Sequence, residues 1–256
     1  MIKTQWIGLW TMMRKETLRI FRIWTQTLLP SVISTSLYFL IFGSFIGNRI
    51  GLIGEVTYLQ FIIPGLVMMS VLTNAYSNVV SSVFSAKFQR NIEELLVSPL
   101  VSPVILLGYI IGGVIRGIIV GTLVFLVSRF FTPLPITHLW IVITTIVGTA
   151  FLFSLLGFIN AVFARKFDDI AIVPTFVLTP LTYLGGVFYS VSYLPPFWQK
   201  VSLFNPILYL VNSFRYGFLG ISDISVHTSL LCMFGLILAL WCLSLFLLQR
   251  GIGFRQ

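Results

Sequence analysis

The chain has 256 residues, of which 57% are hydrophobic and only 9% are charged, and its formal net charge is +9. Soluble domains are about 45–50% apolar and about 25% charged, so this composition excludes a soluble enzyme and leaves no room for a sizeable soluble domain. In such an apolar chain the basic excess indicates membrane topology rather than nucleic-acid binding. We therefore expect a protein that crosses a lipid bilayer several times.

The first expected element is an amphipathic interface helix within residues 1–27, before the first long apolar run. Apolar side chains that include Trp6, Trp10 and Trp24 recur at steps of three and four over residues 5–24, and the basic side chains fall largely on the rest of the helix. A helix of this kind suits the headgroup region of a bilayer. The alternative is an ordinary tail whose charges only set the topology.

Residues 28–256 are expected to form one transmembrane domain. A helix needs roughly 20 mostly apolar residues to cross the hydrocarbon. Six segments are long enough and nearly free of charge: about 28–48, 58–82, 103–128, 138–163, 170–190 and 226–248. These runs are continuous, whereas the strands of membrane barrels are short and alternating. The predicted fold class is an all-α membrane protein with six transmembrane helices.

Lys and Arg are distributed unevenly over the loops between these segments. One side holds most of them: Lys3, Arg14, Lys15, Arg19, Arg22, Lys87, Arg90, Arg165, Lys166, Arg250 and Arg255. The other side holds four: Arg49, Arg129, Lys200 and Arg215. Because cytoplasmic loops are enriched in basic residues, both termini are predicted to be cytoplasmic, which requires an even number of spans.

The second expected span has a polar stripe. Ser70, Asn74, Ser77, Asn78 and Ser81 follow one another at steps of three and four, and so fall on roughly one face of a helix. Two interpretations stay open. The stripe could line a route for a polar or amphipathic molecule, or it could make hydrogen bonds between helices, which membrane bundles use routinely.

The third expected span carries a small-residue ridge and a charge. Gly113, Gly117 and Gly121 have the spacing that lets another helix approach closely. Arg116 lies beside them near the middle of the span, where a guanidinium is costly and should face protein or water. A structural partner on a neighbouring helix, a role in the transport path, and a side chain that reaches the interface all stay open.

The loop over residues 88–103, FQRNIEELLVSPLVSP, concentrates charge in an otherwise apolar chain. Asn91 and Glu94 have the spacing of a capping box, and the prolines Pro99 and Pro103 would end the helix before the next span. The loop is predicted to form a short cytoplasmic helix with acids in its first turn. It could be a simple solubilised loop, or a docking element that inserts into a soluble partner.

The fifth expected span is broken. Pro174 and Pro180 remove backbone donors, and Gly185 and Gly186 weaken the helix further.

The stretch that follows is too polar to cross the membrane and too hydrophobic for a free loop. Non-helical backbone at membrane depth requires a cover of protein or water. We therefore expect two short re-entrant helices within 195–219, over about 195–203 and 206–219. Asn205 suits the cap of the second helix and Pro206 its first position.

Three stretches carry a resemblance to a known family: KFQRNIEELLVSPLVSP, the segment FDDIAIVPTFVLTPLTYLGGVFYSVSYLPPFWQKVSLFNPILYLVNSFRYGFLG, and RKE at 14–16. Together they resemble the type-2 ABC exporter permeases, the membrane subunits of drug, polysaccharide and lipo-oligosaccharide exporters. The likeness covers essentially the whole chain. It implies a multi-pass protein of the bacterial inner membrane in which the short helix of the second loop is a coupling helix.

The resemblance also implies partners. The phosphate-binding pattern G-x-x-x-x-G-K-[ST] does not occur here, so ATP and Mg²⁺ would bind to a separate ATPase subunit and this chain would bind no cofactor. Two copies of the permease, a homodimer, and two copies of the ATPase would form the exporter. The residues implied in the ATPase contact are Arg14, Lys15, Glu16, Arg90, Asn91, Glu93, Glu94 and Leu95.

The cargo would pass between the two permease copies, and a path lined by Asn, Ser, Thr and Tyr with many phenylalanines suits a hydrophobic or lipid-linked substrate. The residues expected along the path and its outer gate are Asn74, Ser77, Asn78, Thr179, Tyr183, Gly185, Gly186, Phe197, Asn205 and Pro206.

Two other classes of function are weighed against an exporter. A secondary transporter or channel not coupled to ATP usually needs acids inside the membrane. Here all acids lie at or outside the ends of the spans: Glu16, Glu55, Glu93, Glu94, Asp168, Asp169 and Asp223. A membrane-embedded enzyme is disfavoured because His138 and His227 lie at span edges and no catalytic or metal-binding motif occurs.

Overall fold

The computed structural model describes residues 2–47, 49, 51–53 and 56–253. Three positions used above lie outside the described residues: Asn48, Glu55 and Arg255.

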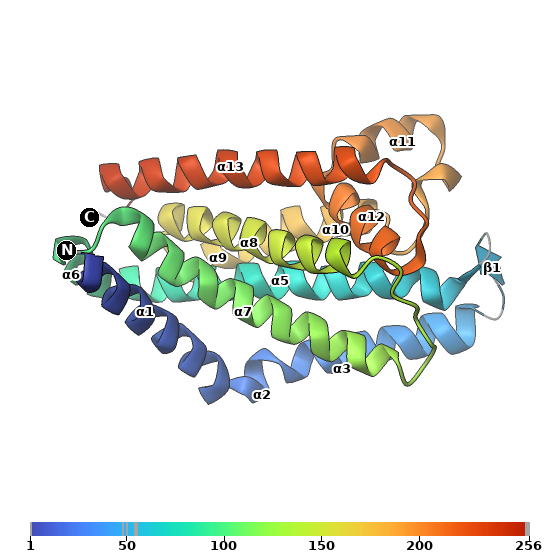
Figure 1. Ribbon diagram of the computed structural model, residues 1–256, viewed down its shortest axis with the longest axis horizontal. Coiled ribbons are helices and arrows are strands. Elements are labelled where there is room, and N and C mark those ends of the chain that lie inside the picture. Colours follow the sequence, from blue (N-terminus) through green and yellow to red (C-terminus); the bar gives the residue numbers. More distant parts are fainter. Residues whose placement is uncertain (1, 48, 50, 54–55, 254–256) are drawn as a thin grey trace.

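The protein is an elongated bundle of helices that run along its long axis (Figure 1). The four longest of these are α5 (Tyr58–Phe88), α7 (Ser102–Ser128), α8 (Leu139–Phe163) and α13 (Val226–Arg250). α5 is the most buried of the long apolar helices, with 78% of its most apolar window inside the protein, and it packs mainly against α7 and α8. α5 is therefore the centre of the bundle.

The N-terminal segment forms a bent arm beside the bundle (Figure 1). Its elements in chain order are α1 (Ile2–Arg22), α2 (Trp24–Thr27), α3 (Leu29–Leu40), a π-helix over Ile41–Gly47 and a two-stranded hairpin, β1 (Leu52–Ile53) with β2 (Val56–Thr57). A helix is present over most of residues 5–24, as α1, and its place at the membrane interface stays a prediction. Its face is not free, however, because Met12, Glu16 and Ile20 are buried.

α7 carries two glycine faces, and the sequence analysis found only one. A Cβ on Gly113 would lie 2.9 Å from the Ala75 carbonyl of α5, so the predicted ridge does allow close approach. The second face receives α1: a Cβ on Gly108 would lie 2.8 Å from Cβ of Met12, and one on Gly112 2.7 Å from Cβ of Glu16. Glycine on both faces lets α7 contact α1 and the core at once.

The fifth expected span is shorter than predicted. It comprises α9 (Asp169–Val173), a π-helical turn (Pro174–Leu178) and α10 (Thr179–Leu184), and the helix ends there because Gly186 adopts φ +70°. Five helices of the described chain are long and apolar enough to cross a membrane, and Asp169–Leu184 is counted among the shorter ones. The six-span count stays a prediction.

The path of the chain bears on that count. α1 begins and α13 ends at the same end of the bundle, next to α6, whereas the β1–β2 hairpin and α11 lie at the opposite end (Figure 1). We call these the α6 end and the α11 end. A chain that starts and finishes at one end traverses the bundle an even number of times, which is what six passes require.

Both short helices expected before the last span are present. They are α11 (Pro196–Leu203) and α12 (Pro206–Leu219), after a 3-10 turn at Val191–Tyr193. Asn205 caps α12 as predicted, since its Oδ1 accepts a hydrogen bond from the Ile207 amide at 3.0 Å. Whether they enter the membrane from one side stays a prediction.

The capping box predicted at Asn91 is wrong. Arg90, with φ +62°, occupies the N-cap position of α6 (Asn91–Val97) without a side-chain capping bond, and Asn91 already lies inside the helix with its Nδ2 donating to Gln89 Oε1 at 3.2 Å. Arg90 stands where a capping residue would be expected, and its left-handed conformation forms the sharp turn out of α5. A capping box does exist at the start of α5, between Thr57 and Gln60.

Candidate functional site

α6 is a short helix held to the bundle by few residues. Ile92 is its only buried residue, with 1% of its surface exposed, whereas Asn91, Glu93 and Glu94 are exposed and Leu95 is half-buried. The two acids border a shallow hollow in the surface together with Val97 and Ser98. The first turn of α6 therefore displays negative charge at the end of the molecule.

Gln5 joins α1 to the link between α6 and α7. Its Nε2 donates to the Pro99 carbonyl at 2.7 Å, and its Oε1 accepts from the Val101 amide at 3.0 Å. Gly8, one turn further along α1, packs directly on Leu100. Because one side chain satisfies both a backbone donor and a backbone acceptor, α1 and the α6–α7 link are fixed to each other.

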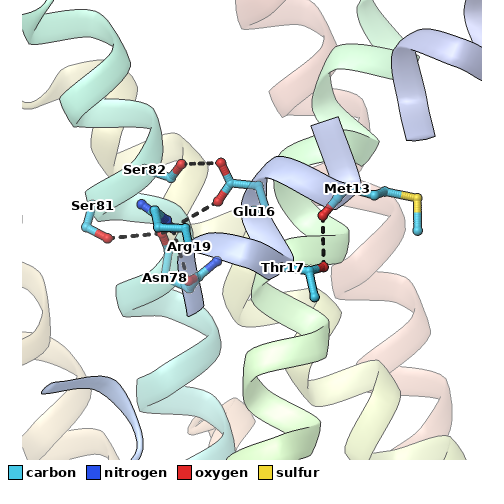
Figure 2. Close-up of polar contacts among 7 residues, drawn as sticks. All are labelled: Met13, Glu16, Thr17, Arg19, Asn78, Ser81 and Ser82. Carbon is cyan, nitrogen blue, oxygen red and sulfur yellow. Dashed lines mark hydrogen bonds and ion pairs between the residues drawn. The ribbon is translucent and has the colours of Figure 1, made fainter. Parts of the chain in front are cut away.

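Glu16 lies inside the protein rather than on its surface. Only 2% of its surface is exposed, its Oε1 accepts from Ser82 Oγ at 2.6 Å, and its Oε2 lies 2.9 Å from Arg19 Nη2 (Figure 2). The expectation that Glu16 contacts a soluble subunit is therefore corrected. Arg14 and Lys15 are exposed.

Arg19 completes this contact between α1 and α5. Its Nη2 donates to Asn78 twice, to the backbone oxygen at 2.9 Å and to Oδ1 at 3.0 Å, and Ser81 Oγ donates to the same backbone oxygen (Figure 2). The pair with Glu16 is the only ion pair found in the described part of the chain. The pair lies within α1, and the hydrogen bonds of its two side chains to Ser82 and Asn78 anchor the arm to the central helix.

Arg116 binds α5 one turn away from this pair. Its Nε and Nη2 donate to Asn74 Oδ1 at 3.2 and 3.0 Å, and Nη2 also lies 3.4 Å from the Thr27 carbonyl of α2. The other end of the Asn74 amide donates to Ser31 Oγ at 2.8 Å. Arg116 thus has structural partners on neighbouring helices, one of the three interpretations left open by its sequence position.

A polar cavity lies between α3 and α5, with a volume of about 220 Å³. We name it for its hydroxyl and amide side chains, although the larger part of its lining surface is apolar, and it is lined by Pro30, Ser31, Ser34, Thr35, Tyr38, Leu66, Met69, Ser70, Thr73 and Asn74. Asn74 had been expected on a path. Asn78 instead binds Arg19, and Ser77 is half-buried on α5 without lining this cavity.

An aromatic cluster adjoins the cavity toward the α11 end. Phe188 is its centre, with ring centroids 6.0 Å from Tyr38, 5.2 Å from Phe42 and 5.6 Å from Tyr183. Tyr58 donates its hydroxyl to the Phe188 backbone carbonyl at 3.1 Å. The cluster therefore links α3 and the start of α5 to α10 and the turn after it.

Arg215 of α12 fixes the same turn from inside. It is 2% exposed, its Nη2 donates to the Gly186 carbonyl at 2.6 Å and its Nε to the Phe61 carbonyl at 3.3 Å, and its guanidinium carbon lies 3.8 Å from the centre of the Phe61 ring. By its position in the sequence, Arg215 was predicted to be a loop charge. The only sequence feature that pointed to Arg215 was the segment that contains it and resembles the type-2 ABC exporter permeases.

The other expected gate residues are only partly brought together. Asn205 donates from Nδ2 to the Leu181 carbonyl at 2.5 Å, which joins α12 to α10 close to Gly185 and Pro206. Thr179 is exposed and donates to the Pro174 carbonyl at 2.9 Å. Phe197 is exposed on α11 and, among the aromatic contacts described, meets only Trp198, edge to face, so it lies apart from the cluster.

Among the described residues, no group of three or more His, Cys, Asp or Glu side chains could hold a metal ion. His138 stacks on Tyr216 with a centroid distance of 5.0 Å. The site is thus built from arginines, amides, hydroxyls and aromatic rings. These groups can bind and orient a molecule.

Comparison with known proteins gives a consistent result. A family model described as ABC-2 type transporter matches residues 8–219. The inner membrane transport permease YadH of Escherichia coli K12 is 56% identical over 257 aligned positions, which cover 100% of both chains. Nodulation protein J of Neorhizobium galegae is 25% identical over 250 positions, covering 96% of this chain and 94% of the relative.

Proposed function

Because this chain belongs to the ABC-2 type transporter family, we propose that it is the membrane-spanning permease subunit of an ATP-driven exporter. The Escherichia coli relative is named an inner membrane transport permease and is similar over its full length. The long apolar helices fit a multi-pass protein of the same bacterial inner membrane. Both termini would be cytoplasmic, in keeping with the basic residues gathered on that side.

The observation that carries the coupling to ATP is the build of α6. A short helix that buries Ile92, packs Leu95 and Leu96 partly against the core and exposes two acids in its first turn is suited to enter a cleft of a soluble subunit. Arg90, Asn91 and Leu95 would border that contact, and Arg14 and Lys15 would flank it from α1. Closure of the ATPase on ATP and Mg²⁺ would then displace α6 and the end of the bundle around it.

Two permease copies and two ATPase subunits would form the working exporter. A hydrophobic or lipid-linked substrate would pass between the permeases. The polar cavity would contact it first, and the aromatic cluster with the turn at Gly185 and Gly186 would be the outer gate. A secondary transporter or channel without ATP coupling is the alternative, and no structural feature of the described chain favours it.

The test is a double charge reversal, Glu93→Arg with Glu94→Arg, in a tagged chain purified from its own membranes. The chain should still insert, while the amount of co-purified ATP-hydrolysing subunit falls at least roughly tenfold, because the charge that α6 presents to the contact would be reversed. Asp168→Arg is the matched control, since Asp168 is an exposed acid at the link before α9. Undiminished co-purification with the double variant would contradict the proposal.

A further inference from the structure

Two guanidinium groups bind neighbouring amides of α5, and only one of them has a counter-charge. Arg19 binds Asn78 and Arg116 binds Asn74, so their partners are four residues, about one helical turn, apart. The carboxylate of Glu16 pairs with Arg19. In the described part of the chain, Arg116 contacts amide and carbonyl oxygens and no carboxylate.

Arg116 lies where such a charge has the greatest effect. It is near the middle of α7, a helix of 27 residues, and Asn74 is near the middle of α5, which has 31. In a bundle that crosses a bilayer, both positions are far from water. An unbalanced guanidinium at this depth is costly, and a neighbouring anion would lower that cost.

The polar cavity begins one side chain away from Arg116. Asn74 lines the cavity, and the same amide connects Arg116 on one side to Ser31 of the cavity wall on the other. Ser34 and Thr73 add exposed hydroxyl groups to the wall. At about 30 Å³ per water molecule, the cavity would hold roughly seven waters, enough for a small polar head group.

We propose that this cavity receives the head group of an anionic amphiphile, whose negative group is balanced by Arg116 and whose hydroxyl groups bond to the Ser and Thr side chains. The assignment rests on the proposed transport function, and it specifies the substrate class of that path as anionic. The hydrocarbon part of the molecule would stay among the apolar helices. A zwitterionic amphiphile would gain less, because its own cation offsets the attraction.

The test measures binding in the full chain without any ATPase. Purified protein is placed in nanodiscs of phosphatidylcholine with one-fifth phosphatidylglycerol, and the lipids that stay bound on gentle release are identified by native mass spectrometry. The wild type should retain phosphatidylglycerol over phosphatidylcholine roughly tenfold more than Arg116→Gln does. Arg116→Lys keeps the charge and should keep most of the preference. Arg14→Gln with Lys15→Gln is the control, because these exposed cations of α1 could collect anionic lipid at the surface.

A second arm separates an amphiphile from a free anion. Nanodiscs of phosphatidylcholine alone are incubated with soluble glycerol phosphate. We expect no binding, because this anion lacks the hydrocarbon chains that would stay among the apolar helices. Three outcomes would overturn the proposal: equal retention of the two lipids by the wild type, a preference that survives Arg116→Gln, or a preference lost only in the α1 control. Since no ATPase is present, none of these outcomes bears on coupling through α6, which the co-purification experiment tests separately.

Discussion

The two ends of the bundle differ in how deeply their polar contacts lie. At the α6 end, Gln5 and Arg19 are partly exposed and α6 buries only Ile92, although Glu16, which accepts a hydrogen bond from Ser82, is buried. At the α11 end, Arg215 and Asn205 are buried and bind backbone carbonyls. A polar contact near water costs little to break, whereas a buried one leaves groups without partners.

This difference suggests a division of work. A displacement of α6 would be passed on to α1, because Gln5 fixes α1 to the α6–α7 link. The α11 end keeps its shape, because Asn212 and Asp223 also connect its loop: the Asp223 amide donates to Asn212 Oδ1 at 2.7 Å, and Ser190 donates to the Asp223 carboxylate at 2.8 Å. Force applied at α6 would thus meet a rigid far end.

The largest effect is expected from Arg215→Met. The substitution keeps a long apolar side chain but leaves the Phe61 and Gly186 carbonyls without their donor, which should cost about 3 kcal/mol of folding free energy. The measurement is the Tm of the detergent-purified chain. Lys200→Met is the matched control, because Lys200 is an exposed cation on α11 and should change Tm very little. Equal Tm values for the two variants would contradict the conclusion that the buried Arg215 stabilises the α11 end.

Gly112→Leu tests how the arm is seated at the α6 end. A side chain at this position collides with Glu16, whose Cβ lies 2.7 Å from where a Cβ would be, and it approaches Asn78. Overpacking of this kind costs about 2 kcal/mol, and it should displace α1 without unfolding the bundle. Limited proteolysis should cut the arm faster in this variant. Gly235→Leu in α13 is the control, because a Cβ there meets nothing within 4 Å.

The positions of the long helices could be predicted from the sequence because a bilayer permits few alternatives. Backbone groups in hydrocarbon must bond within their own helix, so apolar length alone locates the starts of α5, α7, α8 and α13 to within about one residue. Asn205 with Pro206 was equally readable, since each residue has a local reason to be at a helix start. These features depend on neighbours in the chain.

The site depended on contacts that no local pattern contains. A helical wheel showed that α1 has two faces, but the burial of Glu16 results from Gly112 and Ser82, which are far away in the chain. Arg215 was assigned to a loop because charges were counted by position rather than by depth. The capping box at Asn91 failed for a related reason: the turn out of α5 determined the conformation of Arg90, and so moved the start of the helix.

Glu16→Ala and Glu16→Gln separate charge from hydrogen bonding at the α6 end. Alanine removes both the bond from Ser82 and the partner of Arg19, and should cost about 1.5 kcal/mol. Glutamine can still accept from Ser82, so it should lose less of the Tm. The ATP hydrolysis of the assembled exporter should fall more with alanine than with glutamine. If both variants lowered Tm equally, the ion pair rather than the Ser82 bond would hold the arm.

Gln5→Ala has the smallest expected effect on stability, but it tests most directly whether α1 and α6 move together at the α6 end. The clamp on Pro99 and Val101 is near water, so its loss should cost about 0.5–1 kcal/mol and barely lower Tm. Yet α1 would no longer follow α6. If the α6 end moves as a unit, substrate-stimulated ATP hydrolysis should fall while binding of the ATPase subunit persists. Gln26→Ala, an exposed glutamine in α2, should leave both unchanged. A loss of ATPase binding in Gln5→Ala would instead mean that the clamp shapes α6 itself.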